Sequence, residues 1–283
     1  MRIGPQQTIW IAGASGRMGQ AIQHQLDHGR YAVYTTDKEI DVTDLNEVTR
    51  FAEINRPDIV INATGIHTMA EGKAERLAAY GLYALGARNL AVASEGVGAT
   101  IVQISTDDVF SGIKHDPACE FDAPYPSTVY GKAKLAGERM VRELNDQHII
   151  VRSSWVYGNR PDDWLNRVLE AGRTETQIEV PANQFSCPTS CTTFARRIVD
   201  VIESEQFGLF HLADTGSCSR FEWAKAVLEN AGLPTTVLSG SHCEKDGYVR
   251  ILENMMVELT GMPQLPTWQD DLRAFMGANG LLA

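Results

Sequence analysis

The sequence has few basic residues and no long apolar run. Lysine and arginine number 25 against 36 aspartate and glutamate residues, which gives a formal net charge of -11 at pH 7. A nucleic-acid surface needs a basic stripe, so we expect no nucleic-acid partner. No apolar run approaches the ~20 residues that span a bilayer, and the first residues lead into a strand-like segment rather than a secretory signal. We therefore expect a cytoplasmic protein with no membrane partner.

Cysteine is also sparse, and its placement favours no metal site. The five cysteines are scattered along 283 residues. The nearest pair, Cys187 and Cys191, has neither a second pair nor a histidine cluster beside it, as a zinc site would require. We expect reduced thiols and no metal.

What the sequence does contain begins with a glycine-rich turn. An apolar run at residues 8–12 leads into three glycines with GxxGxxG spacing, and a helical pattern follows. Such glycines let the backbone approach a pyrophosphate closely, and the positive end of the helix attracts the same group. The turn predicts a dinucleotide cofactor bound by Gly13, Ser15, Gly16, Arg17, Met18 and Gly19.

The end of the second predicted strand, residues 31–36, bears on the kind of cofactor. Asp37 follows it, in the position where a carboxylate accepts hydrogen bonds from the adenosine ribose hydroxyls. Basic residues nearby could instead contact a 2′-phosphate, so the choice between NADPH and NADH stays open. Candidate adenine contacts a little further on are Asp41 and Val42.

Short side chains follow two more predicted strands, residues 59–62 and 100–104. An α/β sheet admits its ligand at the carboxyl ends of its strands. The candidates delivered to this edge are Ala63, Thr64 and Gly65 after the first strand, and Thr106 and Asp107 after the second.

Strands alternate with helices through residue 158, including a long helical pattern over 70–94. This alternation predicts an α/β fold with a doubly wound parallel Rossmann sheet. We expect an NAD(P)-binding domain over residues 1–158, to which 190–212 return. The predicted smaller carboxyl-terminal, substrate-binding lobe comprises 159–189 and 213–283.

Tyr130 and Lys134 form the candidate catalytic pair. Residues four apart on a helix share a face, so the phenol and the ammonium should project side by side. A neighbouring cation favours the ionised phenol and lowers its pKa from ~10. The pair therefore predicts a general acid at Tyr130.

Several motifs together carry a family resemblance. They are the glycine turn, Ser105-Thr106-Asp107, Tyr130xxxLys134 with Leu-Ala-Gly-Glu after it, Arg152 through Gly158, and Asn183-Gln184-Phe185 ahead of Pro188-Thr189. In their order and spacing the chain resembles the extended short-chain dehydrogenases and, among these, the dTDP-4-dehydrorhamnose reductases.

The resemblance implies reduction of the 4-keto group of a nucleotide-activated 6-deoxy sugar by NADPH or NADH, most simply dTDP-4-dehydro-β-L-rhamnose to dTDP-L-rhamnose. Tyr130 would protonate the ketone oxygen, Lys134 would bind the nicotinamide ribose and lower the pKa of Tyr130, and Thr106 would hydrogen-bond the substrate. Asp107 and Trp155 would shape the sugar pocket. The implied partner is the nucleotide sugar, and a homodimer is compatible with the amphipathic helices.

Departures from the family pattern concern mainly the substrate side. Tyr83 stands where an asparagine is usual, Asp108 replaces a tyrosine, and Asp246 falls where an Arg-Pro dipeptide is usual. Some family members hold magnesium through a carboxylate just after the glycine turn, where this chain has Gln20, which again argues against a metal.

Two alternative functions stay open at this point. One is a non-catalytic, NADP-binding regulatory subunit, similar to that of methionine adenosyltransferase. The other is a related nucleotide-sugar epimerase.

Overall fold

The chain divides into two compact units. The computed structural model describes residues 6–65, 73–113, 116–240 and 247–283. The first unit consists of Met1–Val109, Pro124–Arg152 and Ala195–Phe210, and the second of Phe110–Ala123, Ser153–Phe194 and His211–Ala283. Compared with the predicted domains, residues 110–123, 153–158, 190–194 and 211–212 group with the second unit. The assignment of one domain to the cofactor and the other to the substrate stays a prediction.

A six-stranded sheet forms the centre of the first unit, with the order β10-β5-β4-β3-β1-β2. Its strands are β1 (Gln7–Ala12), β2 (Tyr31–Thr36), β3 (Ile59–Asn62), β4 (Thr100–Thr106), β5 (His148–Ser153) and β10 (Gly208–His211). From β1 the chain moves to one side for β2 and to the other for β3, β4 and β5, which confirms the predicted doubly wound sheet. Ala12 is level with Thr36 and Asn62 in parallel pairings, so the segments that follow these strands start at one edge.

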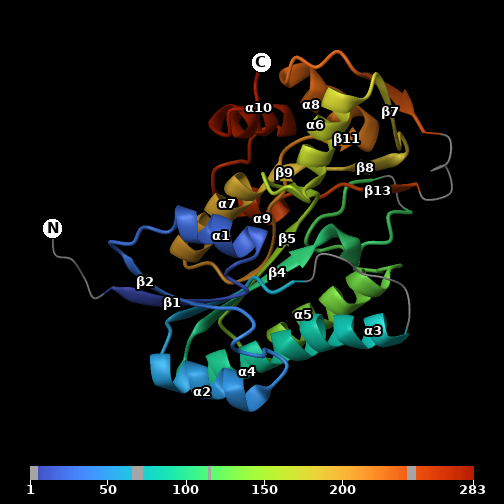
Figure 1. Cartoon of the computed structure of the whole chain (residues 1–283). Coiled ribbons are helices and arrows are strands. Elements are labelled where there is room, and N and C mark those ends of the chain that lie inside the picture. Colours follow the sequence, from blue (N-terminus) through green and yellow to red (C-terminus); the bar gives the residue numbers. More distant parts are fainter. Residues whose placement is uncertain (1–5, 66–72, 114–115, 241–246) are drawn as a thin grey trace. The chain divides into compact units, whose positions relative to one another are not determined.

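Helices cover both faces of this sheet, with α2, α4 and α5 on one face and α1 and α7 on the other (Figure 1). Their bounds are α1 (Arg17–Gln25), α2 (Leu45–Asn55), α3 (Lys73–Tyr80), α4 (Ala87–Val97), α5 (Val129–Leu144) and α7 (Cys191–Glu203). Trp10 is fully buried under α2, where its ring lies 4.5 Å from that of Phe51 and its Nε1 donates to Thr36 Oγ1 at 2.9 Å. This packing fixes the strands whose carboxyl ends carry the candidate site.

The long helix predicted over 70–94, of which residues 70–72 lie outside the described residues, is interrupted by a π-helical turn. Helix α3 runs into η1 (Gly81–Gly86), and α4 starts at the next residue. A π turn inserts extra backbone into a helix and rotates the following side chains. At this turn the carbonyl oxygen of Tyr83 lies so close to Gly137 of α5 that a Cβ there would overlap it. Only glycine therefore allows α5 and η1 this approach.

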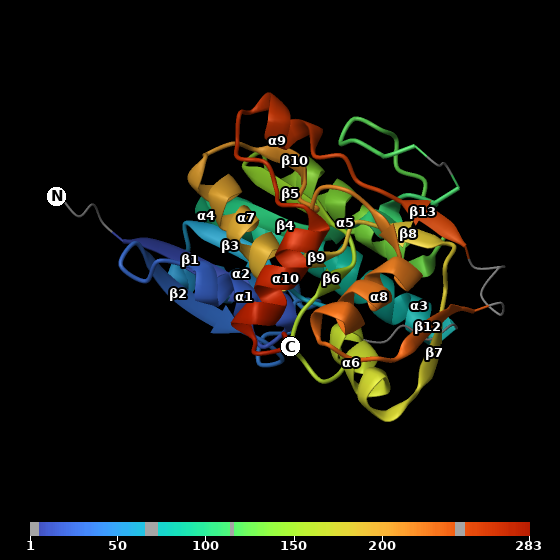
Figure 2. The same cartoon turned by 90° about the horizontal axis from the view of Figure 1, so that it is seen from above.

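Smaller sheets make up the second unit (Figure 2). Strand β8 (Gln184–Ser186) pairs with β11 (Cys218–Ser219) and β13 (Tyr248–Arg250), β7 (Gln177–Val180) with β12 (Thr236–Ser239), and β6 (Val156–Tyr157) with β9 (Thr189–Ser190). The helices are α6 (Trp164–Thr174), α8 (Arg220–Asn230), α9 (Met255–Leu259) and α10 (Trp268–Ala278). Trp223 of α8 is buried in the core of this unit. In the described part of the chain no helix has both the length and the apolar character of a membrane span.

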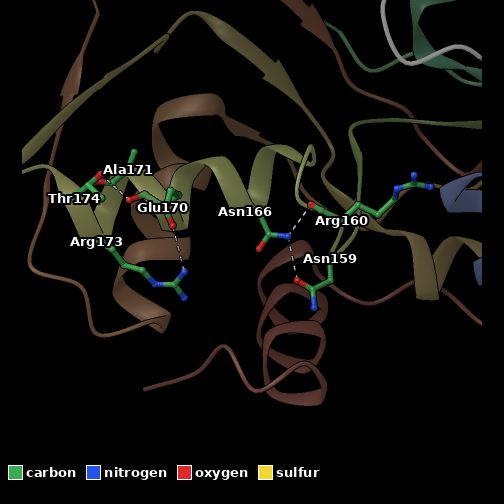
Figure 3. A network of polar contacts seen from close by, with 7 residues as sticks. All are labelled: Asn159, Arg160, Asn166, Glu170, Ala171, Arg173 and Thr174. Atoms are coloured by element: carbon green, nitrogen blue, oxygen red, sulfur yellow. Dashed lines mark hydrogen bonds and ion pairs between the residues drawn. The ribbon is translucent and has the colours of Figure 1, made fainter.

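Polar contacts fix both ends of α6 (Figure 3). Near its start, Asn166 Nδ2 donates to Asn159 Oδ1 at 3.1 Å and to the carbonyl of Arg160 at 2.8 Å. Near its end, an exposed ion pair joins Arg173 to Glu170 at 3.8 Å and contributes little in water. The amino-terminal bonds are the stronger constraint, and they hold the loop before the tryptophan that opens α6.

The contact between α5 and η1 gives a stability prediction. We expect Gly137→Ala to lower the free energy of unfolding by roughly 1–3 kcal/mol, because the added methyl group overlaps the Tyr83 carbonyl. Urea unfolding followed by circular dichroism measures the change. The matched control is Gly96→Ala in α4, where a Cβ would have nothing within 4 Å, so alanine should be neutral or stabilising there. Equal effects at the two positions would contradict this account.

Candidate active site

The glycine turn forms a cradle that side chains would fill. Gly13 has φ +84°, and a Cβ at this position would lie 2.8 Å from the backbone of Ala63 and Thr64. A Cβ on Gly19 would overlap the carbonyl oxygen of Gly13. Helix α1 begins directly after Gly16, which has no side chain to cap the amino-terminal N–H groups. The turn therefore fits a pyrophosphate held by backbone N–H groups.

Asp37 is hydrogen-bonded to this turn. Its carboxylate accepts hydrogen bonds from the Ser15 N–H at 3.0 Å and from Ser15 Oγ at 2.9 Å. The half-buried side chains of Arg17 and Met18 follow in the first turn of α1. A carboxylate is thus held at the end of β2, where the sequence predicts a ribose contact.

The remaining cofactor candidates lie in the same unit. Asp41 accepts hydrogen bonds from the N–H and hydroxyl of Thr43, which lower the pKa of its carboxyl group. Val42 is buried, and its carbonyl accepts from Asn89 Nδ2 at 3.0 Å. The candidates that follow β3 are Ala63, Thr64 and Gly65, of which Gly65 is exposed.

Thr106 and Tyr130 meet where β4 ends and α5 begins. Thr128 caps α5 by accepting from the Gly131 N–H at 2.9 Å. Thr106 Oγ1 accepts from the Asp108 N–H at 3.2 Å, and the Thr106 side chain is a polar neighbour of the Tyr130 phenol that lowers its pKa in part. Thr106 also donates to the neighbouring aspartate, Asp107, at 3.1 Å. Two of the three predicted catalytic residues are therefore neighbours.

The pKa of Tyr130 differs from the expectation. Burial raises it above the ordinary value, and electrostatic interactions with Tyr83, Asp108 and Asp107 raise it further. The Nζ of Lys134 lies 6.0 Å from the Tyr130 ring centroid. The pKa of Tyr130 is therefore raised overall, and the lowering contribution of Lys134 stays a prediction. Tyr130 keeps its proton at neutral pH.

Lys134 is a buried cation held from several sides. Its Nζ donates to the carbonyl of Ile104 in β4 at 3.0 Å. Burial lowers the pKa of Lys134 to about 8, and the carboxylate of Glu138 one turn later raises it in part. Glu138 itself accepts from Arg152 Nε at 2.9 Å and from Arg152 Nη2 at 2.7 Å, and also from Ser105 Oγ. A buried, paired carboxylate thus supports the buried ammonium.

In the second unit, Trp155 occupies a strained position. Its φ is +37°, which bulky side chains rarely adopt. The indole Nε1 donates to Tyr248 Oη at 3.1 Å, and the guanidinium of Arg220 stacks 3.6 Å from the indole centroid. Arg220 also lies 4.7 Å from the ring of Trp164, so it is sandwiched between two indoles. Such over-determined strain is typical of functional sites.

Sequence reasoning missed the contribution of Tyr248, which lies 93 residues from Trp155 and belongs to no motif.

Of the departures from the family pattern, Tyr83 lies against Tyr130 with ring centroids 5.3 Å apart, and Asp108 contributes to the raised pKa of that tyrosine. Asp246 lies outside the described residues. Within the described ranges no group of three or more histidine, cysteine, aspartate or glutamate side chains could hold a metal, and the absence of a metal stays a prediction.

A doubly wound sheet with a glycine cradle and a Thr–Tyr–Lys set defines a nicotinamide-dependent oxidoreductase of the short-chain dehydrogenase type. The model of the RmlD substrate binding domain family matches residues 7–279, and the chain belongs to this family.

Named relatives agree with that assignment. The spore coat polysaccharide biosynthesis protein SpsK of Bacillus subtilis is 30% identical, over 95% of this chain and 96% of its own. The dTDP-4-dehydrorhamnose reductase of Escherichia coli is 30% identical over 80% of each chain. The crystal structure of dTDP-4-dehydrorhamnose reductase from Bacillus anthracis in complex with NADP superposes with a TM-score of 0.91 at 34% identity, covering 96% of this chain and 99% of the other. The predicted family, fold and reductase class are confirmed.

The burial of Lys134 gives a pH prediction. The folded state holds this pKa at about 8, against ~10.4 in an unfolded chain, so between these values the unfolded state binds more protons. The burial of the charged lysine is therefore destabilising below pH 8, and the destabilisation is relieved as pH rises toward 10.

Urea titrations give the free energy of unfolding of Lys134→Met and of wild type. We expect the difference between the two, variant minus wild type, to be more positive by roughly 3 kcal/mol at about pH 7 than at about pH 10. Lys132→Met, at an exposed lysine of the same helix, is the control. A difference between wild type and Lys134→Met that does not vary with pH would contradict the predicted linkage.

Proposed function

We propose that this protein reduces the 4-keto group of a nucleotide-activated 6-deoxy sugar with NADPH or NADH, converting dTDP-4-dehydro-β-L-rhamnose to dTDP-L-rhamnose. The observation that carries the proposal is that Thr106 is a polar neighbour of the protonated Tyr130, with the buried Lys134 on the same helix. The relatives that bear the name dTDP-4-dehydrorhamnose reductase support the choice of sugar.

Tyr130 is the proposed proton donor. Its raised pKa keeps the phenol protonated, so it can give its proton to the ketone oxygen as that oxygen gains charge. The Thr106 hydroxyl would hydrogen-bond the same oxygen and orient it. The positive charge of Lys134 would stabilise the tyrosinate left after the transfer. A reduced nicotinamide, when bound, supplies the hydride.

The proposed binding residues follow from the cradle and its neighbours. The glycine turn would hold the pyrophosphate, Asp37 the adenosine ribose, and Lys134 the nicotinamide ribose. Further proposed cofactor contacts are Arg17, Met18, Asp41, Val42, Ala63, Thr64 and Gly65. Asp107 and Trp155 are proposed to contact the sugar.

The proposal also includes a cytoplasmic location and a homodimer, without nucleic-acid or membrane partners. Light scattering on the purified protein tests the oligomeric state.

The direct test uses dTDP-4-dehydro-L-rhamnose as substrate. It follows the oxidation of NADPH or NADH by the loss of reduced-nicotinamide absorbance at about 340 nm. We expect Tyr130→Phe to lower kcat by roughly 100-fold or more, because a general acid contributes about that much. The variant should still bind the cofactor, since only a hydroxyl is removed. Bound cofactor without any turnover by wild type would favour a regulatory subunit instead, and product formed without net cofactor oxidation would favour an epimerase.

Asp37 gives a prediction on cofactor choice. A carboxylate fastened to the turn repels a 2′-phosphate, so Asp37→Asn should raise the ratio of kcat/KM for NADPH over NADH by roughly tenfold. Glu39→Gln, a neighbouring carboxylate whose Oε1 accepts from the Asp37 N–H, is the control for a general change in charge. The same ratio in Asp37→Asn and wild type would count against Asp37 as the selecting residue.

A further inference from the structure

Tyr83 places the face of its ring against the catalytic lysine. The residue lies on η1 and is only 4% exposed. The Nζ of Lys134 is 4.7 Å from the Tyr83 ring centroid, closer than the 6.0 Å that separates it from the ring of Tyr130. The rings of Tyr83 and Tyr130 meet edge to face, with 5.3 Å between centroids and an interplanar angle of 80°. The ammonium is thus flanked by two aromatic rings.

A cation over an aromatic face is stabilised most where water is excluded. Lys134 is such a case, because the side chain is 6% exposed and its hydrogen bond to the Ile104 carbonyl leaves two further N–H donors. The carboxylate of Glu138 already shares its charge with Arg152. An electron-rich ring is therefore a substantial partner for the ammonium.

We propose that Tyr83 is a positioning residue, which keeps the Lys134 ammonium charged and in place through the face of its ring. This inference rests on the proposed function, because it assumes that Lys134 serves the reaction at Tyr130. It assigns a role to one of the residues at which the chain departs from the family pattern.

The π turn is the structural reason that Tyr83 reaches Lys134. Each residue of an α-helix advances by about 100°, so the extra residue of a π turn moves the following side chains to another face. Tyr83 sits inside this turn, and its carbonyl oxygen contacts Gly137 of α5. One backbone irregularity therefore presents both the ring and the carbonyl of Tyr83 to the catalytic helix.

Other charged groups around the pair must be considered in any pH experiment. On α5 itself these are Tyr130 and Glu138, with Arg152 of β5 paired to Glu138. At the end of β4, Asp107 and Asp108 act on Tyr130. A substitution at Tyr83 leaves the three carboxylates and Arg152 in place. It also removes the contribution of the Tyr83 phenol to the raised pKa of Tyr130, but Tyr83→Phe and Tyr83→Leu share this change, so their difference reports on the ring alone.

The test compares pH profiles of kcat/KM for three variants. In wild type we expect activity to fall as pH rises through about 8, where Lys134 loses its proton. Tyr83→Leu should move this fall to lower pH by roughly 0.5–1.5 units, since the aromatic face is lost. Tyr83→Phe keeps the face and should retain the wild-type profile. Tyr80→Leu removes an aromatic ring of α3 that lies beside Arg76 and should also leave the profile unchanged.

A second measurement does not depend on turnover. A double-mutant cycle of Tyr83→Leu and Lys134→Met in urea unfolding should give a coupling of roughly 3- to 30-fold in the ratio of folded to unfolded protein at about pH 6.5. The coupling should weaken at about pH 10, where Lys134 is neutral in the folded state.

The outcomes separate this inference from the proposed function. Inactivity of the wild type on every keto sugar, with the pH-dependent coupling present, would overturn the function and leave the contact between Tyr83 and Lys134 established. A coupling that is absent at both pH values would overturn the inference. So would a shift in Tyr83→Phe as large as that in Tyr83→Leu, because the hydroxyl rather than the ring would then be responsible.

Discussion

The arrangement of the first unit depends on one buried charge, the ammonium of Lys134. A lysine out of water is unfavourable unless polar groups replace its hydration. The Ile104 carbonyl, the carboxylate of Glu138 and the ring of Tyr83 do so, and each comes from a different element. Strand β4, helix α5 and turn η1 must therefore all be in register before the lysine can be accommodated, so fold and site are specified together.

The parts of the site that the sequence predicts are those set by local spacing. Gly13, Gly16 and Gly19 follow from a strand-to-helix turn, and Tyr130 and Lys134 from the helical repeat. The raised pKa of Tyr130 could not be predicted in this way, because it arises from burial and from aspartates that follow another strand. The π turn also escapes prediction, since the pattern over 70–94 predicts one continuous α-helix and the turn occurs within it.

Contacts over long sequence distances account for what was missed in the second unit. The indole of Trp155 is fixed by Arg220 at the start of α8 and by Tyr248 in β13. No pattern within a window of helix or strand length joins these residues. The aromatic rings and the guanidinium are neighbours in the fold but not in the sequence, so their stacking is seen in the coordinates and not in the periodicity.

The positive φ of Trp155 has a consequence for protein engineering. A glycine would adopt this backbone without strain, whereas a bulky residue stores on the order of 1–3 kcal/mol there. The stacked indole partly offsets that strain in the folded protein. Selection for heat resistance alone would therefore favour glycine at 155 and remove the indole. A thermostable version of this protein should be sought with position 155 held fixed.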